Sequence, residues 1–295
     1  MRLDIALCAA AAALIAGCTI GPPYQRPEAE LPTTWQGAPV EGVRATGDRW
    51  WTMYSDPALD KLVEESLTYN QDLAFATARV DEARAQARIV ESLSLPSVDA
   101  TFVRDRARSS ERSAIPLPPS VPLERNDYTA RLNVSYEADL WGRLQSASNA
   151  ARATLLATEA ARETLRITLA TETVRAYFAL IALDAQVAAT ARSLKLRSDG
   201  LALQKVRYRA GLINDFTLRQ LEAEVHAARA QLPALEAKRT AQELALAVLL
   251  GRSPRAIMDG AVARRTEQGE PAAPVVPEGL PSDLLTQRPD IRETE

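Results

Sequence analysis

Histidine, cysteine and aromatic residues are scarce in this chain of 295 residues, which contains one histidine, two cysteines and 5% aromatic residues. The single histidine leaves almost no material for a histidine-based catalytic site or a histidine-rich metal site. A strong excess of one charge is also absent, because 35 Lys and Arg stand against 38 Asp and Glu, for a net charge of −3. Composition therefore gives no indication of catalysis, of a metal centre or of an acidic or basic tail.

Glycine and proline are present in ordinary amounts, with 12 and 18 residues, which excludes a collagen-like or wholly disordered chain. Apolar residues make up 46% of the sequence, with a large share of alanine, and charged residues make up another 25%. A chain rich in alanine and charge but poor in aromatics typically forms long packed helices. We therefore expect a mainly helical protein.

The N-terminus has the pattern of an export signal. Arg2 is followed by an apolar run over residues 5–16, which is too short to span a bilayer and has the length of a secretory signal. Small residues then precede Cys18, and this arrangement resembles the lipobox of bacterial lipoproteins. We expect residues 1–17 to be removed and Cys18 to be lipidated. The residue after the cysteine is Thr19, and in this the chain resembles lipoproteins that are sorted to the outer membrane. An ordinary signal peptide with an incidental cysteine is the alternative.

An extended strap is expected over residues 18–55, because prolines are scattered there without an apolar period. A helix follows over residues 56–95, opened by Asp56 as the N-cap and Pro57 in the first turn, and stopped by Pro96. Its apolar residues recur with a helical period throughout. This pattern predicts one continuous helix.

Residues 97–140 change to the alternating period of β-strands. Apolar and polar residues alternate strictly over residues 127–140, and a weaker alternation over residues 98–103 precedes them across a proline-rich loop. We predict a hairpin of two transmembrane β-strands, since a tilted strand needs ~9 to 11 residues to cross a membrane. A soluble sheet with one solvated face is the alternative. The residues expected to face lipid are Tyr128, Leu132, Val134 and Tyr136.

The helical period returns over residues 143–250. Proline is absent from residues 143–209, which predicts a single helix of about 67 residues, or ~100 Å. Two helices of about half that length, residues 56–95 and 216–250, could lie end to end alongside it in a coiled-coil arrangement. A soluble coiled coil or a solenoid of helical pairs is the alternative, but neither explains an inserted membrane hairpin.

A turn is expected over residues 209–215, between the long helix and the next one. Gly211 is suited to a positive φ after the first helix, and Asp215 is placed to cap the second. The second helix, residues 216–250, contains Pro233. Because proline removes a backbone donor, Pro233 should kink this helix or split it in two.

Several short motifs follow one another along the whole chain. They are Gly21-Pro22-Pro23-Tyr24-x-Arg26-Pro27, Trp50-Trp51 with Asp56-Pro57-x-Leu59, Asn70-x-Asp72-Leu73, Tyr136-Glu137-x-Asp139-Leu140-Trp141-Gly142-Arg143, the turn around Gly211, and Leu280-Pro281-x-Asp283-Leu284-Leu285-x-x-Arg288-Pro289-Asp290-Ile291-Arg292. Each motif is weak, but the ordered set resembles the outer membrane factor (TolC-like) family. The match is closest to its NodT-type lipoprotein branch, which serves resistance-nodulation-division efflux systems.

The resemblance implies one repeat of a trimeric α/β-barrel duct, in which long antiparallel coiled-coil helices continue a membrane barrel through the periplasm. It implies a channel component of a tripartite efflux pump, lipid-anchored in the outer membrane, that passes exported compounds passively, without an active site, metal or cofactor. The implied partners are two further copies in a homotrimer, a periplasmic adaptor protein, an inner-membrane transporter and outer-membrane lipid, but no nucleic acid. Residues 251–281 would contribute to an equatorial collar. The implied adaptor-docking tip comprises Arg209, Gly211, Leu212, Asn214 and Asp215.

One departure from the family concerns its internal duplication. The spacing of Leu67, Thr68, Asp72 and Leu73 recurs at Leu285, Thr286, Asp290 and Ile291, so residues 282–295 resemble the start of a second repeat. Two strands per chain in a trimer would give fewer strands than the smallest membrane barrels contain. We therefore hypothesise a fragment of a longer duct. The alternatives are a membrane-tethered periplasmic scaffold or adaptor, and a non-functional fragment.

A few polar residues could suggest other chemistry. His226 has no second histidine or cysteine nearby in the sequence, so packing or surface exposure explains it better than ligation. Asp139, Trp141 and Arg143 lie where the strand becomes a helix, and an aromatic belt and a helix start account for them. Asp215 is equally consistent with helix capping and with adaptor docking.

Overall fold

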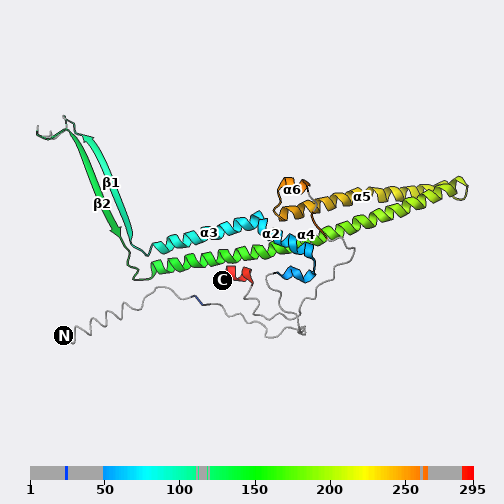
Figure 1. Cartoon of the computed structure of the whole chain (residues 1–295), viewed down its shortest axis with the longest axis horizontal. Coiled ribbons are helices and arrows are strands. Elements are labelled where there is room, and N and C mark those ends of the chain that lie inside the picture. Colours follow the sequence, from blue (N-terminus) through cyan, green and yellow to red (C-terminus); the bar gives the residue numbers. More distant parts are fainter. Residues whose placement is uncertain are drawn as a thin grey trace. The chain divides into compact units, whose positions relative to one another are not determined.

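A computed structural model describes residues 24–25, 49–110, 112, 118, 120–259, 262–264 and 288–295. The predicted signal peptide, Cys18, most of the strap, most of the predicted collar segment, and residues 282–287 of the predicted second-repeat segment lie outside these residues. The chain divides into two compact units, one of residues 1–27 and 81–156 and the other of residues 28–80 and 157–295. The elements, labelled in Figure 1, are η1 (Trp50–Tyr54), α2 (Pro57–Tyr69), α3 (Gln71–Ser92), β1 (Ser97–Arg108), β2 (Glu124–Ser135), α4 (Arg143–Arg209), α5 (Asp215–Leu249), α6 (Pro254–Asp259) and α7 (Pro289–Thr294).

The first unit contains the predicted hairpin, in which β1 and β2 pair antiparallel from Ser97↔Ser135 to Arg108↔Glu124. Strand β2 therefore begins before the predicted alternation and ends at Ser135, so Tyr136 and the residues up to 140 lie beyond it. Their alternation continues, but β1 starts at Ser97 and provides no partner beyond that point. Pro96 immediately precedes β1 and has no N–H with which to extend the ladder.

The predicted single helix over residues 56–95 is wrong, because the structure breaks it at Asn70 into α2 and α3. Asn70 is extended, with φ −64° and ψ 131°, and its side-chain oxygen accepts hydrogen bonds from the N–H groups of Asp72 (2.9 Å) and Leu73 (3.2 Å). Its amide nitrogen donates to the Leu249 carbonyl oxygen at 3.0 Å. One side chain therefore caps α3 and holds the break against α5.

Helix α5 runs unbroken from Asp215 to Leu249 with Pro233 inside it, so the predicted split does not occur. Proline removes one backbone donor from the helix. Contacts with α4 hold α5 on both sides of that position, through Glu222 with Lys205 (3.0 Å) and through Gln242, whose amide donates to the Ala176 carbonyl oxygen (3.2 Å). Packing along the neighbouring helix thus offsets the missing bond.

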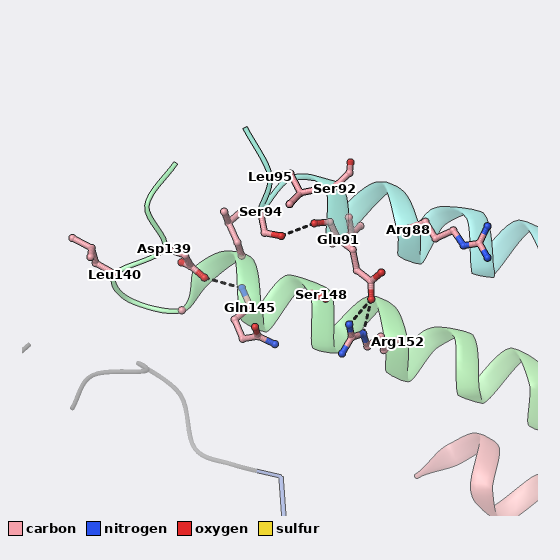
Figure 2. A pocket seen from close by; sticks show the side chains of 13 residues that line it. Arg88, Glu91, Ser92, Ser94, Leu95, Asp139, Leu140, Gln145, Ser148 and Arg152 are labelled. Atoms are coloured by element: carbon pink, nitrogen blue, oxygen red, sulfur yellow. Dashed lines mark hydrogen bonds and ion pairs between the residues drawn. The ribbon is translucent and has the colours of Figure 1, made fainter. Parts of the chain in front are cut away.

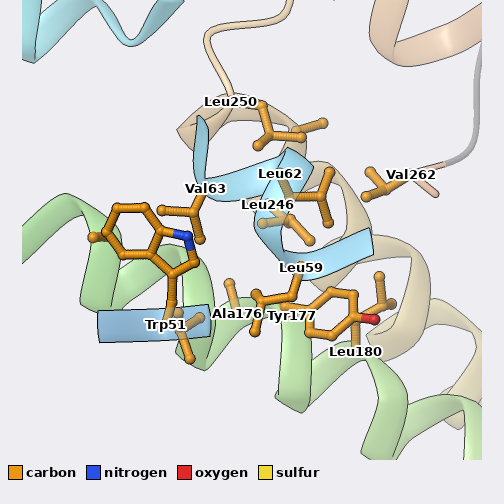
Figure 3. Close-up of a cluster of buried hydrophobic side chains, with 13 residues drawn as sticks. Trp51, Leu59, Leu62, Val63, Ala176, Tyr177, Leu180, Leu246, Leu250 and Val262 are labelled. Atoms are coloured by element: carbon orange, nitrogen blue, oxygen red, sulfur yellow. The ribbon is translucent and has the colours of Figure 1, made fainter. Parts of the chain in front are cut away.

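The hydrophobic core belongs to the second unit, where η1, α2, α4 and α5 meet (Figure 3). Two buried hydrogen bonds join α2 and its N-cap to α4: the Tyr177 hydroxyl donates to the Asp56 carboxylate (2.6 Å), and the Thr173 hydroxyl donates to that of Ser66 (3.1 Å). The buried cluster consists of Trp51, Leu59, Leu62, Val63, Ala170, Val174, Ala176, Tyr177, Leu180, Leu246, Ala247, Leu250 and Val262.

Candidate functional site: a two-faced hairpin and a helical tip

One face of the hairpin is apolar and exposed. Directly paired residues of antiparallel strands share a face, so β1 adds Val98, Ala100 and Phe102 to the alternating residues of β2. Phe102 is 72% exposed, Leu132 71% and Tyr128 60%. Such large apolar side chains carry a substantial cost in water, at about 25 cal/mol per Å² of apolar surface. The hairpin therefore needs an apolar neighbour on this face.

The other face of the hairpin is polar. It carries the pairs Asp99↔Asn133 and Thr101↔Arg131, and the hydroxyls of Ser97 and Ser135 lie 2.7 Å apart. An apolar face and a polar face on the same two strands are the pattern of a membrane barrel with a wet interior. Of the four residues predicted to face lipid, three lie on the apolar face of β2: Tyr128, Leu132 and Val134. Tyr136 follows the strand and is 63% exposed.

The junction between β2 and α4 carries charged contacts. Arg143 donates to the Glu137 carboxylate through two nitrogens, at 2.7 to 3.0 Å, and the Asp139 carboxylate accepts from the N–H of Gln145 at 2.8 Å. This backbone hydrogen bond is the main reason that the pKa of Asp139 lies below its usual value. Trp141, between these residues, is exposed. The junction is therefore a capped helix start, as predicted for Asp139 and Arg143, beside an exposed aromatic side chain.

A depression of ≈ 680 Å³ lies beside this junction, between the end of α3 and the start of α4 (Figure 2). Glu91 of α3 and Arg152 of α4 line it and form an ion pair, with an oxygen–nitrogen distance of 2.6 Å. Asp139 and Gln145 lie at its other side. Its lining mixes charged residues with Leu95 and Leu140. The ion pair joins the two helices just below the hairpin.

The capping bond of Asp139 predicts a pH-dependent helix start. Because the folded-state pKa is lowered from 3.8, the stabilisation is complete above that value and is lost as the pH falls through the lower folded value. In the Asp139→Ala variant, we expect the Gln145 N–H to exchange with solvent roughly fivefold faster than in the wild type at neutral pH. Hydrogen exchange measured by mass spectrometry checks this. Asp139→Asn keeps an acceptor and is the control, and equal exchange in Asp139→Ala and the wild type would contradict the capping role.

The tip between α4 and α5 is closed by a Schellman motif around Gly211. Gly211 has φ 72°, its N–H donates to the Tyr208 carbonyl oxygen at 2.9 Å, and the Leu212 N–H donates to the Arg207 carbonyl oxygen at 2.9 Å. These two bonds satisfy carbonyl groups that the end of α4 leaves open. Helix α4 ends at Arg209, so the predicted turn is placed correctly along the chain.

The cap of α5 is Asn214, not Asp215 as predicted. The Asn214 side-chain oxygen accepts from the N–H of Thr217 at 2.9 Å and from its hydroxyl at 2.7 Å. Asp215 occupies the first helical position and pairs with Arg219 at 3.5 Å. An asparagine before an aspartate offers two possible caps, and the extended backbone of Asn214, φ −86° and ψ 166°, decides between them.

Exposed apolar and charged side chains meet at this tip. Leu212 is 67% exposed and Phe216 is 76% exposed. Behind them, Lys205 pairs with Glu222 at 3.0 Å, and the pKa of Glu222 is lowered chiefly by its hydrogen bond with Lys205. Arg209 is also exposed. The tip thus presents apolar side chains on two helices that are joined by ion pairs between their side chains. Such a surface suits contact with another protein.

A charged cluster that sequence reasoning missed lies where residues 262–264 meet the helices. Arg264 pairs with Asp184 of α4 at 2.8 Å and with Glu243 of α5 at 2.6 Å, and the Val262 N–H donates to Glu243 at 3.0 Å. The three charged residues are partly buried, and Val262 is buried. In the sequence the acids look like ordinary members of solvated helix faces, so no local signal could have found them. The cluster attaches the chain after α6 to the helical pair.

The described part of the chain bears on two other kinds of site, a metal site and a membrane-spanning helix. No group of three or more His, Cys, Asp or Glu side chains is placed there to hold a metal ion, and His226 is exposed on α5. One described helix, α4, is long and apolar enough by composition to cross a membrane. Of its apolar stretch 22% is buried, and Val174 and Tyr177 of α4 belong to the hydrophobic core, so this part of α4 packs against protein. The apolar face of the hairpin is therefore the better candidate for membrane contact.

The sequence pattern of a known family, outer membrane efflux protein, matches residues 62–252. This stretch contains α3, the hairpin, α4 and α5. The chain belongs to the outer membrane efflux protein family. This family consists of transport channels rather than enzymes, and the predicted resemblance to it is confirmed.

Named relatives of this chain agree with that assignment. It is 33% identical over 298 residues to the probable efflux pump outer membrane protein TtgC of Pseudomonas putida, a match that includes 97% of this chain and 59% of TtgC. It is 28% identical to nodulation protein T of Rhizobium leguminosarum bv. trifolii, over 96% of this chain and 59% of that protein. The chain thus spans about three fifths of the length of these relatives.

A solved structure confirms the predicted fold class. The Campylobacter jejuni CmeC outer membrane channel superimposes with a TM-score of 0.76 and 24% identity, over 94% of this chain and 59% of CmeC. At that identity the likeness concerns the fold alone. This chain therefore has the mainly helical fold, with an antiparallel strand pair, that the periodicities predicted.

Proposed function

We propose that this chain supplies part of an outer-membrane channel in a tripartite efflux pump, through which exported compounds pass without chemical change. The observation that carries the proposal is the exposed apolar face of β1 and β2 backed by a polar face. Lipid would cover the first face and water the second. Family membership supports the same reading, since TtgC is named as an efflux pump outer membrane protein.

The open edges of the hairpin support an assembled channel. Within the described residues each strand pairs only with the other, so both outer edges carry unpaired N–H and C=O groups. In lipid each unsatisfied group costs several kcal/mol, and closed barrels are the β-structures that avoid this cost. The edges would therefore pair with neighbouring strands in the channel, and we infer a homotrimer as the assembled state.

The tip and the N-terminus complete the proposed arrangement. Arg209, Gly211, Leu212, Asn214 and Asp215 would receive a periplasmic adaptor protein, which joins the channel to an inner-membrane transporter. The exposed Leu212 beside charged side chains supports this role. Lipidation of Cys18 would anchor the chain to the outer membrane, with the helices in the periplasm.

Protease protection of the hairpin tests the proposed membrane position. Trypsin cuts after Lys and Arg, and β2 contains Arg125 and Arg131. We expect both sites to resist trypsin in outer-membrane vesicles that carry the full chain, and to be cut after detergent disrupts the vesicles. Cleavage in intact vesicles at a rate equal to that in detergent would overturn the membrane assignment and favour a periplasmic scaffold.

Charge substitutions test the proposed docking tip. Leu212→Asp and Phe216→Asp should each lower adaptor cross-linking in cells at least roughly tenfold, because a hot-spot side chain at an interface contributes about 2 kcal/mol or more. Val248→Asp is the matched control, because Val248 is another exposed apolar residue of α5, remote in sequence from the tip. Equal cross-linking in the tip variants and the control would contradict docking at residues 209–215.

A further inference from the structure

The apolar face of the hairpin changes character along its length. In the register of β1 and β2, Val98, Ala100 and Phe102 share this face with three arginines that follow at alternate positions. These arginines are Arg104, Arg106 and Arg108. Successive members lie about 6.6 to 6.8 Å apart along the strand. We call them the arginine row, and it occupies the half of the hairpin that is farther from α3 and α4 along the chain.

The arginine row is only partly neutralised. Its partners on β2 are Tyr128, Asn126 and Glu124, so the three arginines share one carboxylate across the ladder. The Arg106 guanidinium lies 2.9 Å from Glu124, and that of Arg108 lies 3.9 Å from it. Arg104 instead lies over the Tyr128 ring, 5.7 Å from its centre. The face therefore carries a net positive charge next to its apolar half.

This arrangement is costly inside a bilayer and favourable at its surface. An arginine on the lipid-facing side of a barrel is strongly destabilising at the midplane of the bilayer and costs little near the interface. A guanidinium binds a phosphate through two parallel hydrogen bonds, and the Tyr128 ring beneath Arg104 is typical of an interface position. The apolar half and the arginine row thus match lipid tails and lipid headgroups in that order.

We propose that the arginine row binds the phosphate groups of lipid headgroups in the outer leaflet, and that it fixes the depth of the hairpin in the membrane. The occupant is a phosphorylated lipid rather than a protein, because the row continues the face proposed to contact lipid. This inference rests on the proposed membrane position of the hairpin. It goes further by naming the lipid group that is bound, a phosphate, and the three arginines that bind it.

Lipid titration of the full chain in detergent tests the proposal. The probes are lipid A, lipid A from which both phosphates have been removed, and inorganic phosphate, with bound lipid counted by native mass spectrometry. The test variant is Arg104→Gln with Arg106→Gln. The matched control is Arg125→Gln with Arg131→Gln on the polar face, since each pair contains one ion-paired arginine.

We expect lipid A to bind the wild type and the polar-face control equally, and the test variant roughly tenfold to thirtyfold more weakly, because each basic charge near an anionic surface contributes roughly fivefold. Lipid A without phosphates should bind weakly to all three. Equal losses in both variants, equal binding of the dephosphorylated lipid, or inorganic phosphate binding as tightly as lipid A would each overturn the proposal. The trypsin assay separates the two hypotheses, because a protected hairpin without lipid A selectivity removes only the role of the arginine row.

Discussion

Gly251→Ala is expected to destabilise the protein by about 3–5 kcal/mol, a large loss for a single methyl group. Gly251 has φ 69°, where a residue with a Cβ atom is strained by about 1–2 kcal/mol. A Cβ atom at this position would also lie 2.1 Å from the Tyr69 carbonyl oxygen and 2.5 Å from its carbon. Backbone atoms at the end of α2 would therefore have to move.

That movement would disturb the junction between α2, α3 and α5. Asn70 bonds the Leu249 carbonyl oxygen there, and Arg252 binds the Glu65 carboxylate through two nitrogens at 2.7 and 2.9 Å. The same bonds are the main reason that the pKa of Arg252 is raised. Because these contacts depend on the close approach of Gly251 to Tyr69, they should weaken together in the variant.

Substitutions at two other glycines distinguish the effect of backbone strain from the effect of the collision with Tyr69. Gly211 has φ 72° with nothing within 4 Å of an added Cβ atom, so Gly211→Ala should cost only about 1–2 kcal/mol. Gly200 lies in α4 with open space and no positive φ, so Gly200→Ala should stabilise by about 0.5–1 kcal/mol. Thermal unfolding of the full chain in detergent, followed by helical circular dichroism, measures all three. A Gly251→Ala loss no larger than that of Gly211→Ala would contradict the collision.

Asp56→Ala is expected to destabilise the protein by about 2–4 kcal/mol, because it removes two kinds of hydrogen bond at once. The Asp56 carboxylate caps α2 by accepting from the N–H groups of Ala58 (2.9 Å) and Leu59 (3.3 Å). Its other oxygen accepts from the Tyr177 hydroxyl of α4 at 2.6 Å. Asp56 is 5% exposed, so water cannot readily replace these bonds.

Tyr177→Phe provides the comparison, since it removes the hydroxyl that donates to Asp56 and leaves the Asp56 carboxylate in place to cap α2. We expect it to cost about 1–2 kcal/mol, with the cap of α2 intact. Asp56→Asn keeps a capping oxygen and should fall between the two. The same unfolding measurement applies, and a loss in Tyr177→Phe as large as that in Asp56→Ala would mean that the cap contributes nothing.

The sequence predicted those features that a short window of residues encodes. The alternation over residues 127–140 depends on neighbours two positions apart, and the structure has a strand over most of it. The bounds of α4 follow from the start motif at Gly142 and the turn at Gly211, where positive φ values of 74° and 72° favour glycine. The tip is therefore located by local signals, although the choice of Asn214 over Asp215 as its cap was not.

The position of the arginine row depends on both the sequence and the register of the two strands. Arg104, Arg106 and Arg108 alternate in the sequence, but only the pairing with β2 places them on the face of Leu132 rather than on that of Arg131. A slip of one residue would move every side chain to the other face. The identity of the face is thus a property of the strand pair, not of either strand.

The sequence by itself predicted an export signal, and it determined the helical and alternating segments and the family. Each of these depends on residues close together in the chain or on short motifs in order. Only the tertiary structure decided that a helix stops at Asn70, that Gly251 must lack a side chain, and that Arg264 joins Asp184 to Glu243. These features depend on backbone and charged groups brought together across long stretches of chain. Periodicity records which face of a helix is buried, but not which distant carbonyl or carboxylate that face will meet.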